Sequence, residues 1–201
     1  MKLKKISAVL GAAITLSAMA FSSSAHAEAV TGTAGAAAHL DFTVVIPATM
    51  SFRVGALAAT VSAITFQPTA AQVGTGTAVA ATATSGDLGN GKVTATVTGN
   101  KSQITITAGV TGALTGTIPG TTIPWTQIST ASSSAANLPA PQIPVTGTSG
   151  SVSALAPVLG ITNVTAQWTY TYINTVTPAA GTYGGTGGAG NGRVTYTAAM
   201  P

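Results

Sequence analysis

The chain contains no cysteine among its 201 residues. Disulfide bonds, thiol nucleophiles and cysteine-ligated metal centres are therefore excluded. The fold has to be stabilised by packing and strand pairing, even in an oxidising compartment that would permit disulfides.

Charge is also scarce, because Asp, Glu, Lys and Arg make up 5% of the chain. Three of the seven cations, Lys2, Lys4 and Lys5, lie at the very start. After Ala27 the charged residues are Arg53, Lys92, Lys101, Arg193, Glu28, Asp41 and Asp87. Four scattered cations cannot form the clustered basic face that nucleic-acid binding requires. Disorder does not follow from the low charge, since 45% of the residues are hydrophobic and disordered chains are poor in such residues.

Groups suited to catalysis are few. After Ala27 there is one histidine, His39, and there are three carboxylates. A glycosidase needs two carboxylates across one cleft, and a metal centre generally needs three or four ligands. The segment "GTGGAG" at Gly185–Gly190 matches the dinucleotide-binding pattern, but a predicted strand follows it where that pattern requires a helix. We expect no enzymatic activity, no metal site and no cofactor.

The first 27 residues have the pattern of a secretory signal peptide. A basic start precedes an apolar stretch from Ile6 to Phe21, and small residues precede a cleavage point after Ala27. No later segment has 18 consecutive apolar residues, so no transmembrane helix is expected. We predict a secreted bacterial protein of the periplasm, cell surface or extracellular space, with residues 28–201 forming one domain.

Alternation of apolar and polar residues dominates the rest of the chain and predicts strands. In "HLDFTVVIP", Leu40, Phe42, Val44 and Ile46 share one face of a predicted strand. In "GNGKVTATVTGNKSQITITAG", residues 93–98 and 104–107 predict a hairpin closed by the turn "GNKS". The all-β class follows, as an antiparallel sandwich with Greek-key or immunoglobulin-like connections.

The triplet Gly-Asn-Gly occurs twice, at Gly89–Gly91 and Gly190–Gly192, each time followed by a cation and alternating Val and Thr. Asn and Gly tolerate the positive φ angles of tight turns. Each triplet therefore predicts a turn before a half-exposed strand. The second of these strands, near residues 194–198, is expected to pair with the strand in "NVTAQWTYTYIN".

Two further features are open to more than one interpretation. Residues 111–160 hold most of the prolines, which predicts loops with short edge strands around Ile123–Ile128, lying across the sandwich or forming a flap. Trp168, Tyr170 and Tyr172 share one strand face. These rings either fill the core or, together with Trp125, form a stacking platform for a sugar or another ligand.

The last strand, in "GTY…GRVTYTA" at Gly181–Ala198, resembles bacterial secreted pilin-like domains, nearest to chaperone–usher fimbrial subunits of the spore-coat-U type. The resemblance implies an incomplete immunoglobulin-like sandwich whose groove is filled by the N-terminal strand of the next subunit. It implies that "AVTGTAGAAAHLDFTVVI" at Ala29–Ile46 holds that strand.

We therefore predict a secreted structural or adhesive surface protein, such as a pilus or filament subunit, that associates with itself or with other surface subunits by β-strand addition. An open sheet edge is a template for such pairing. Two alternatives remain: an extracellular glycan- or ligand-binding module, and a small outer-membrane β-barrel.

Overall fold

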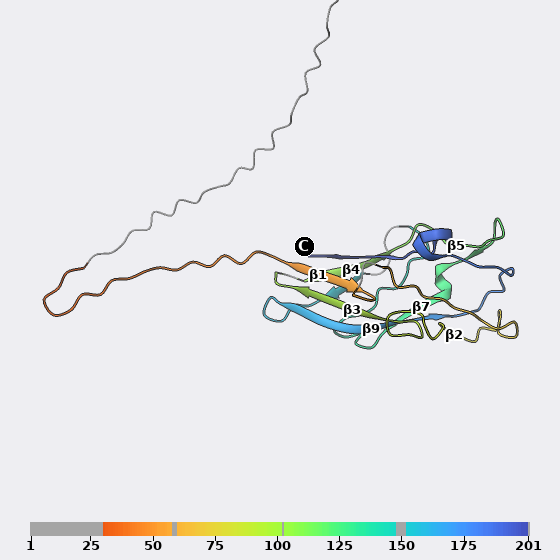
Figure 1. Cartoon of the computed structure of the whole chain (residues 1–201), viewed down its shortest axis with the longest axis horizontal. Helices are drawn as coiled ribbons and strands as arrows, with labels where there is room; N and C mark the ends of the chain where they lie inside the picture. Colours follow the sequence, from red (N-terminus) through yellow and green to blue (C-terminus); the bar gives the residue numbers. More distant parts are fainter. Residues whose placement is uncertain (1–29, 58–59, 102, 148–151, 201) are drawn as a thin grey trace, which may run out of the picture. The chain divides into compact units, whose positions relative to one another are not determined.

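A computed structural model describes residues 30–57, 60–101, 103–147 and 152–200 (Figure 1). The chain divides into two units between Ile46 and Pro47. Residues 30–46, called the arm below, contain no helix or strand. The unit from Pro47 onward holds every described strand and is called the β domain. The predicted signal peptide, residues 1–27, lies outside the described residues.

The described part of the β domain consists of short strands joined by turns. The strands are β1 Met50–Val54, β2 Val79–Ala80, β3 Lys92–Gly99, β4 Ile104–Gly109, β5 Leu114–Thr115, β6 Thr122–Ile123, β7 Ile128–Ser132, β8 Val152–Leu155, β9 Thr162–Tyr172 and β10 Thr195–Ala199. Two 3-10 segments accompany them, η1 Trp125–Gln127 and η2 Thr186–Asn191. The predicted all-β class is confirmed. Within the described residues, no helix has the length and apolar character needed to span a bilayer.

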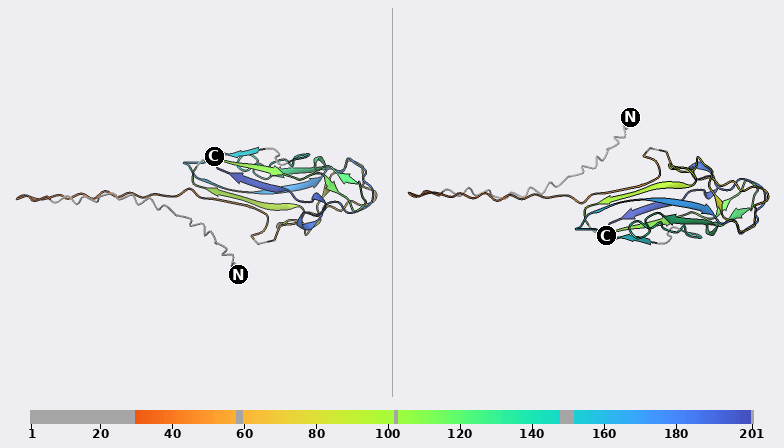
Figure 2. Two further views of the ribbon diagram at one scale, coloured as in Figure 1. Left: turned by 90° about the horizontal axis from the view of Figure 1, so that it is seen from above. Right: turned by 90° about the horizontal axis from the view of Figure 1, so that it is seen from below.

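The strands form two main antiparallel sheets. One has the order β1-β3-β9-β2, with β7 also pairing with β9, and the other has the order β10-β4-β8. Strands β5 and β6 form a separate small pair. Figure 2 shows the strands in two layers, and apolar residues of both layers belong to one core. The Greek-key or immunoglobulin-like connectivity stays a prediction.

The core follows directly from the alternation in the sequence. Every second residue of β3 is buried, starting at Val93, because successive side chains of a strand point to opposite faces. Strand β4 buries Ile104 and Ile106 in the same way, and Trp168 on β9 is completely buried.

The predicted hairpin between residues 93–98 and 104–107 is wrong. Both strands form, but β3 pairs with β1 and β9, whereas β4 pairs with β10 and β8. The chain crosses from one sheet to the other after Gly99. A Cβ atom at Gly99 would lie 2.7 Å from the Cδ1 atom of Ile104, so glycine permits this close crossing.

The predicted pairing of the last two long strands is also wrong. Strand β9 lies in the first sheet and β10 in the second. The residues behind that prediction nevertheless meet across the core: the rings of Trp168 and Tyr196 have centroids 5.3 Å apart.

The turn predictions for Gly-Asn-Gly agree with the structure. Gly89, Asn90 and Gly91 have φ angles of 75°, 52° and 75°, and β3 begins at the next residue. Gly190 and Asn191 have φ angles of 54° and 57° shortly before β10.

The proline-rich region 111–160 contains the short strands β5 to β8 and η1. Its expected strands around Ile123–Ile128 correspond to β6, η1 and the start of β7. The described part of the region is not a loose flap, because Trp125, Leu138 and Ile143 belong to the hydrophobic core.

Candidate functional site

The arm exposes the apolar residues that the sequence predicted to form a strand. The side chains of Leu40, Phe42, Val44 and Ile46 are 75%, 87%, 83% and 76% exposed. The described residues of the arm form no strand. Burying such side chains stabilises a protein by about 1.5–3 kcal/mol each. Burial of these four side chains against an apolar surface would therefore be strongly favourable.

Several strands of the β domain have a single strand neighbour among the described residues, and β1 and β10 are two of them that border the groove described below. Strand β1 pairs with β3 alone, and β10 pairs with β4 alone. They run in opposite directions: β1 begins at Met50, opposite Gly99, whereas β10 ends at Ala199, opposite Thr105. Unpaired backbone N–H and C=O groups on such edges can bind a further strand.

An apolar groove with a volume of about 870 Å³ lies in the β domain. Its floor is formed by buried residues, which are the apolar or aromatic Val93, Ile123, Trp125, Ile128, Ile143, Tyr170 and Tyr172 and the polar Asn174. Most of the more exposed lining residues come from two segments: Val54 with residues 61–68, which follow β1, and residues 178–188 with 192–194, which lead into β10. Tyr196, on β10 itself, also lines the groove. The groove is thus bounded by the segment that follows β1 and by the segment that leads into β10.

The groove lining is nearly free of charge. Among the described residues that line it, only Arg193 is charged. Ile64, Phe66 and Val194 are partly buried and pack against the core, so they present apolar surface to the groove. An apolar occupant suits this lining, because a charged group placed against the apolar floor would lose its hydration.

The four aromatic residues predicted as a ligand platform are all buried. Trp125, Trp168, Tyr170 and Tyr172 are 6%, 0%, 7% and 5% exposed. These four rings therefore belong to the core, and none is exposed on the surface as a stacking platform would require. Trp125, Tyr170 and Tyr172 form part of the groove floor, while Trp168 is not among the lining residues. The indole nitrogen of Trp125 donates a hydrogen bond to the carbonyl oxygen of Gly112 at 2.7 Å, which fixes its ring.

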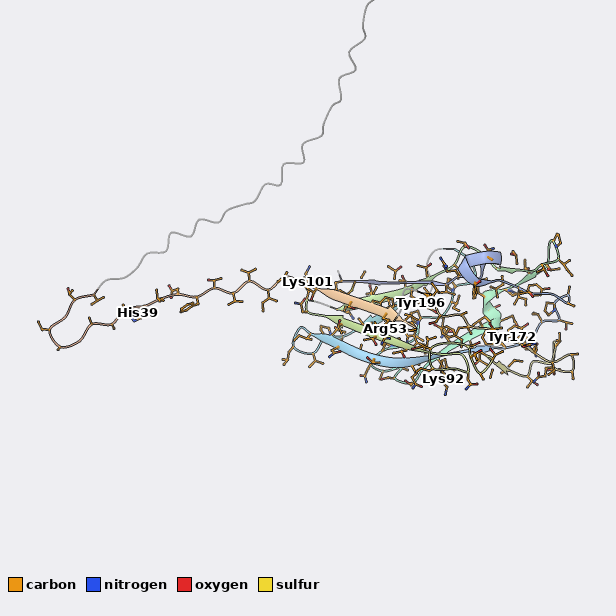
Figure 3. The ribbon with its side chains drawn as sticks, in the orientation of Figure 1. His39, Arg53, Lys92, Lys101, Tyr172 and Tyr196 are labelled. Atoms are coloured by element: carbon orange, nitrogen blue, oxygen red, sulfur yellow. The ribbon has the colours of Figure 1, made fainter. Side chains whose placement is uncertain are left out.

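A pair of tyrosines connects the two sheets beneath the groove. The hydroxyl oxygens of Tyr170 on β9 and Tyr196 on β10 are 2.9 Å apart, and either can be the donor. Burial raises the pKa of Tyr170 to about 12, although its hydrogen bond with Tyr196 acts in the opposite direction. Burial also raises the pKa of Tyr196 well above its ordinary value, and the nearby Tyr170 adds to this. Both phenols are therefore neutral hydrogen-bonding groups at physiological pH. Figure 3 shows Tyr196 and Tyr172 within the β domain.

The start of β1 is held by one amide side chain. The backbone N–H of Thr49 donates to Asn100 Oδ1 at 2.7 Å, and Asn100 Nδ2 donates to the carbonyl oxygen of Pro47 at 2.9 Å. The backbone N–H of Asn100 also donates to the carbonyl oxygen of Thr49 at 3.3 Å. Asn100 thereby extends the pairing of β1 and β3 by one residue pair and fixes the chain directly after the arm.

Sequence reasoning found the arm but not the groove. Residues 194–198 were predicted to form a half-exposed strand, yet nothing in the sequence marked one face of it as incompletely covered. Ile64 and Phe66 belong to no described strand, and Phe66 makes only an isolated bridge, to Ala81. The groove unites segments more than 100 residues apart, and no local pattern carries that information.

No group of three or more His, Asp or Glu side chains in the described residues could hold a metal ion. Comparisons with protein-family models, with curated proteins and with solved structures found no match.

Proposed function

We propose that this chain is a secreted structural or adhesive surface protein whose copies assemble by β-strand addition. The arm of one copy lies in the groove of another and pairs with the free edge of β10. Leu40, Phe42, Val44 and Ile46 face the groove, and Asp41 and Thr43 face outward. Filaments of the pilus type are the expected product.

One observation carries the proposal: a single chain exposes an alternating apolar segment and also contains an apolar groove beside the free edges of β1 and β10. The seven residues from Leu40 to Ile46 span about 20–24 Å when extended, at about 3.3 Å per residue. This length covers the five residues of β10. The charge balance fits as well, because the arm's one acid among residues 30–46 is Asp41 and the lining's one charge is Arg193.

The direction of the added strand decides the form of the assembly. Because β1 and β10 run in opposite directions, a strand between them is antiparallel to one and parallel to the other. Antiparallel pairing with β10 makes each copy receive an arm at one end and offer its own at the other, which builds an open filament. Antiparallel pairing with β1 would let two copies exchange arms and close as a dimer. We propose pairing with β10, because its free edge has an uninterrupted alternation of inward and outward residues from Arg193 to Met200.

The ligand-binding alternative has less support. Sugar-binding aromatic residues have to be accessible for stacking, and the four candidates are less than a tenth exposed. A ligand of the groove would have to be apolar and extended, and the arm has both properties.

Negative-stain electron microscopy of the mature chain, beginning at Glu28 and kept free of detergent, tests the proposal. We expect filaments from the natural sequence and from Thr43→Asp, which changes the outward face of the arm. Phe42→Asp places a charge on the inward face and should leave monomers in light scattering. Filaments from Phe42→Asp, or monomers from the natural sequence at high concentration, would refute assembly through the arm.

A further inference from the structure

The turn between β8 and β9 carries exposed apolar side chains that the core does not use. Val158, Leu159 and Ile161 are 75%, 97% and 57% exposed. We call Val158–Ile161 the tip. It is a closed two-residue turn, because the N–H of Val158 donates to the carbonyl oxygen of Ile161 at 2.9 Å and the reverse bond measures 3.0 Å.

Leu159 occupies a position that normally excludes leucine. Its φ angle is 54° and that of Gly160 is 78°, the pattern of a type I′ turn. The first position of such turns favours Asn, Asp or Gly, and a leucine there is strained. Leu159 is thus unfavourable for the backbone conformation of the turn, and its exposed apolar side chain is unfavourable in water. Backbone strain of this kind is often found at functional positions.

The tip lies at the end of the β domain where the chain leaves the arm. Ile161 directly precedes Thr162, which pairs with Gly99, and Gly99 pairs with Met50 at the start of β1. Figure 3 places Lys101, which follows the same end of β3, close to the start of β1. The turn between β5 and β6, residues 116–121, lies toward the opposite end, where Figure 1 labels β5. That turn exposes Ile118, at 46%.

The link between the arm and β1 is short. Only Pro47, Ala48 and Thr49 separate Ile46 from Met50, so the two Cα atoms are at most about 14 Å apart. Asn100 already holds Pro47 and Thr49 against β3. An arm seated as far as Ile46 therefore brings the arm-bearing end of its own β domain against the domain that receives it.

The receiving end is set by the direction of β10. Strand β10 ends at the same end as the start of β1, since Ala199 pairs with Thr105 near the beginning of β4. An arm antiparallel to β10 leaves the groove at the opposite end, which carries the turn 116–121.

We propose that the tip of one copy packs against the turn 116–121 of the next copy, as a second contact besides the inserted arm. The occupant of the tip is a second copy of this chain, and the contact is made mainly by Leu159 and Ile118. This inference rests on the proposed assembly through the arm and on antiparallel pairing with β10. It explains why an apolar, strained residue occupies the tip.

Cysteine trapping tests the contact directly, because the chain has no cysteine of its own. The double variant Leu159→Cys with Ile118→Cys should form a ladder of disulfide-linked multimers in oxidised filaments. The single variant Leu159→Cys should form none. A covalent dimer from the single variant would mean that tips meet each other and would overturn the proposal. Filaments without a ladder would overturn the tip contact but would not contradict assembly through the arm. Absence of filaments from the same sample would overturn both the tip contact and assembly through the arm.

A second variant distinguishes the effect of Leu159 on assembly from its effect on the stability of the monomer. Leu159→Asn suits the turn, so the monomer carrying Phe42→Asp should unfold at a higher temperature with this change than without it. In the chain with its natural arm, Leu159→Asn should raise the critical concentration for filaments about tenfold, because the buried leucine surface is lost. An unchanged critical concentration would contradict the proposal.

Discussion

The hydroxyl groups of Tyr170 and Tyr196 meet at 2.9 Å and join the two sheets across the core. Each ring comes from a different sheet, and Tyr196 also packs against Trp168. Because both side chains line the groove, the hydrogen bond holds the groove floor on β9 and the free edge strand β10 at a fixed spacing.

Removing either hydroxyl should destabilise the β domain. Tyr170→Phe or Tyr196→Phe leaves the remaining buried hydroxyl without its partner, which costs about 1–3 kcal/mol. The double variant should lose less than the sum of the two single variants, because no unsatisfied hydroxyl remains. Denaturant unfolding of the Phe42→Asp monomer measures all three. Strictly additive losses would show that the two hydroxyls do not interact.

Stability should fall at alkaline pH through the same pair. Free tyrosine ionises near pH 10, whereas burial raises the pKa of Tyr170 to about 12 and that of Tyr196 also upward. The unfolded chain therefore loses these protons first. The stabilisation from Tyr170 is complete below pH 10 and declines between pH 10 and 12, by about 1.4 kcal/mol per pH unit. Tyr196 adds to this decline above pH 10, because its pKa is raised as well. Thermal unfolding from pH 8 to 12 should show this decline, and it should be shallower in the double Phe variant; equal slopes would contradict the account.

Asn100 should determine how firmly the chain after the arm is held. Asn100→Ala removes its side-chain bonds to Thr49 and Pro47. We expect the amide of Thr49 to exchange with deuterium about five- to tenfold faster, as loss of a hydrogen bond worth about 1–1.5 kcal/mol implies. The amide of Gly55 bonds to the carbonyl oxygen of Thr94 and serves as the control. Equal acceleration at Gly55 would mean that the whole strand opens.

The first Gly-Asn-Gly turn should tolerate substitution far less than an open turn. A Cβ atom at Gly91 would lie 2.8 Å from the carbonyl oxygen of Tyr170 and 2.8 Å from Ala81 Cβ. Gly120 has a similar φ angle, 80° against 75°, but nothing within 4 Å of such an atom. Gly120→Ala should therefore cost about 1–2 kcal/mol from the left-handed backbone alone. Gly91→Ala should cost clearly more in denaturant unfolding, and equal losses would contradict the close packing at Gly91.

The sequence predicted where strands lie much better than which strands pair. Alternation identified β3, β4, β9 and β10, because each has one face toward the core. Pairing depends on which sheet each strand joins. The short connection after Gly99 suits a hairpin as well as a crossing between sheets, so the alternation of Val93 and Ile104 could not distinguish them.

The candidate site was predictable only in part. Leu40, Phe42, Val44 and Ile46 were recognised as a strand face, and the resemblance to pilin-like domains suggested their use. Their exposure could not be predicted, because periodicity shows which residues share a face and not which molecule supplies the partner. Arg193 and Phe66, more than 120 residues apart, meet at one groove only in the folded chain.

Complementation between two defective copies tests the central claim most directly. Phe42→Asp leaves an intact groove with a defective arm, and Val194→Arg leaves an intact arm with an obstructed groove. Each variant alone should be monomeric in light scattering, and an equimolar mixture should give a heterodimer that grows no further. A mixture that stays monomeric while both variants remain folded, or filaments from either variant alone, would contradict insertion of the arm of one copy into the groove of another.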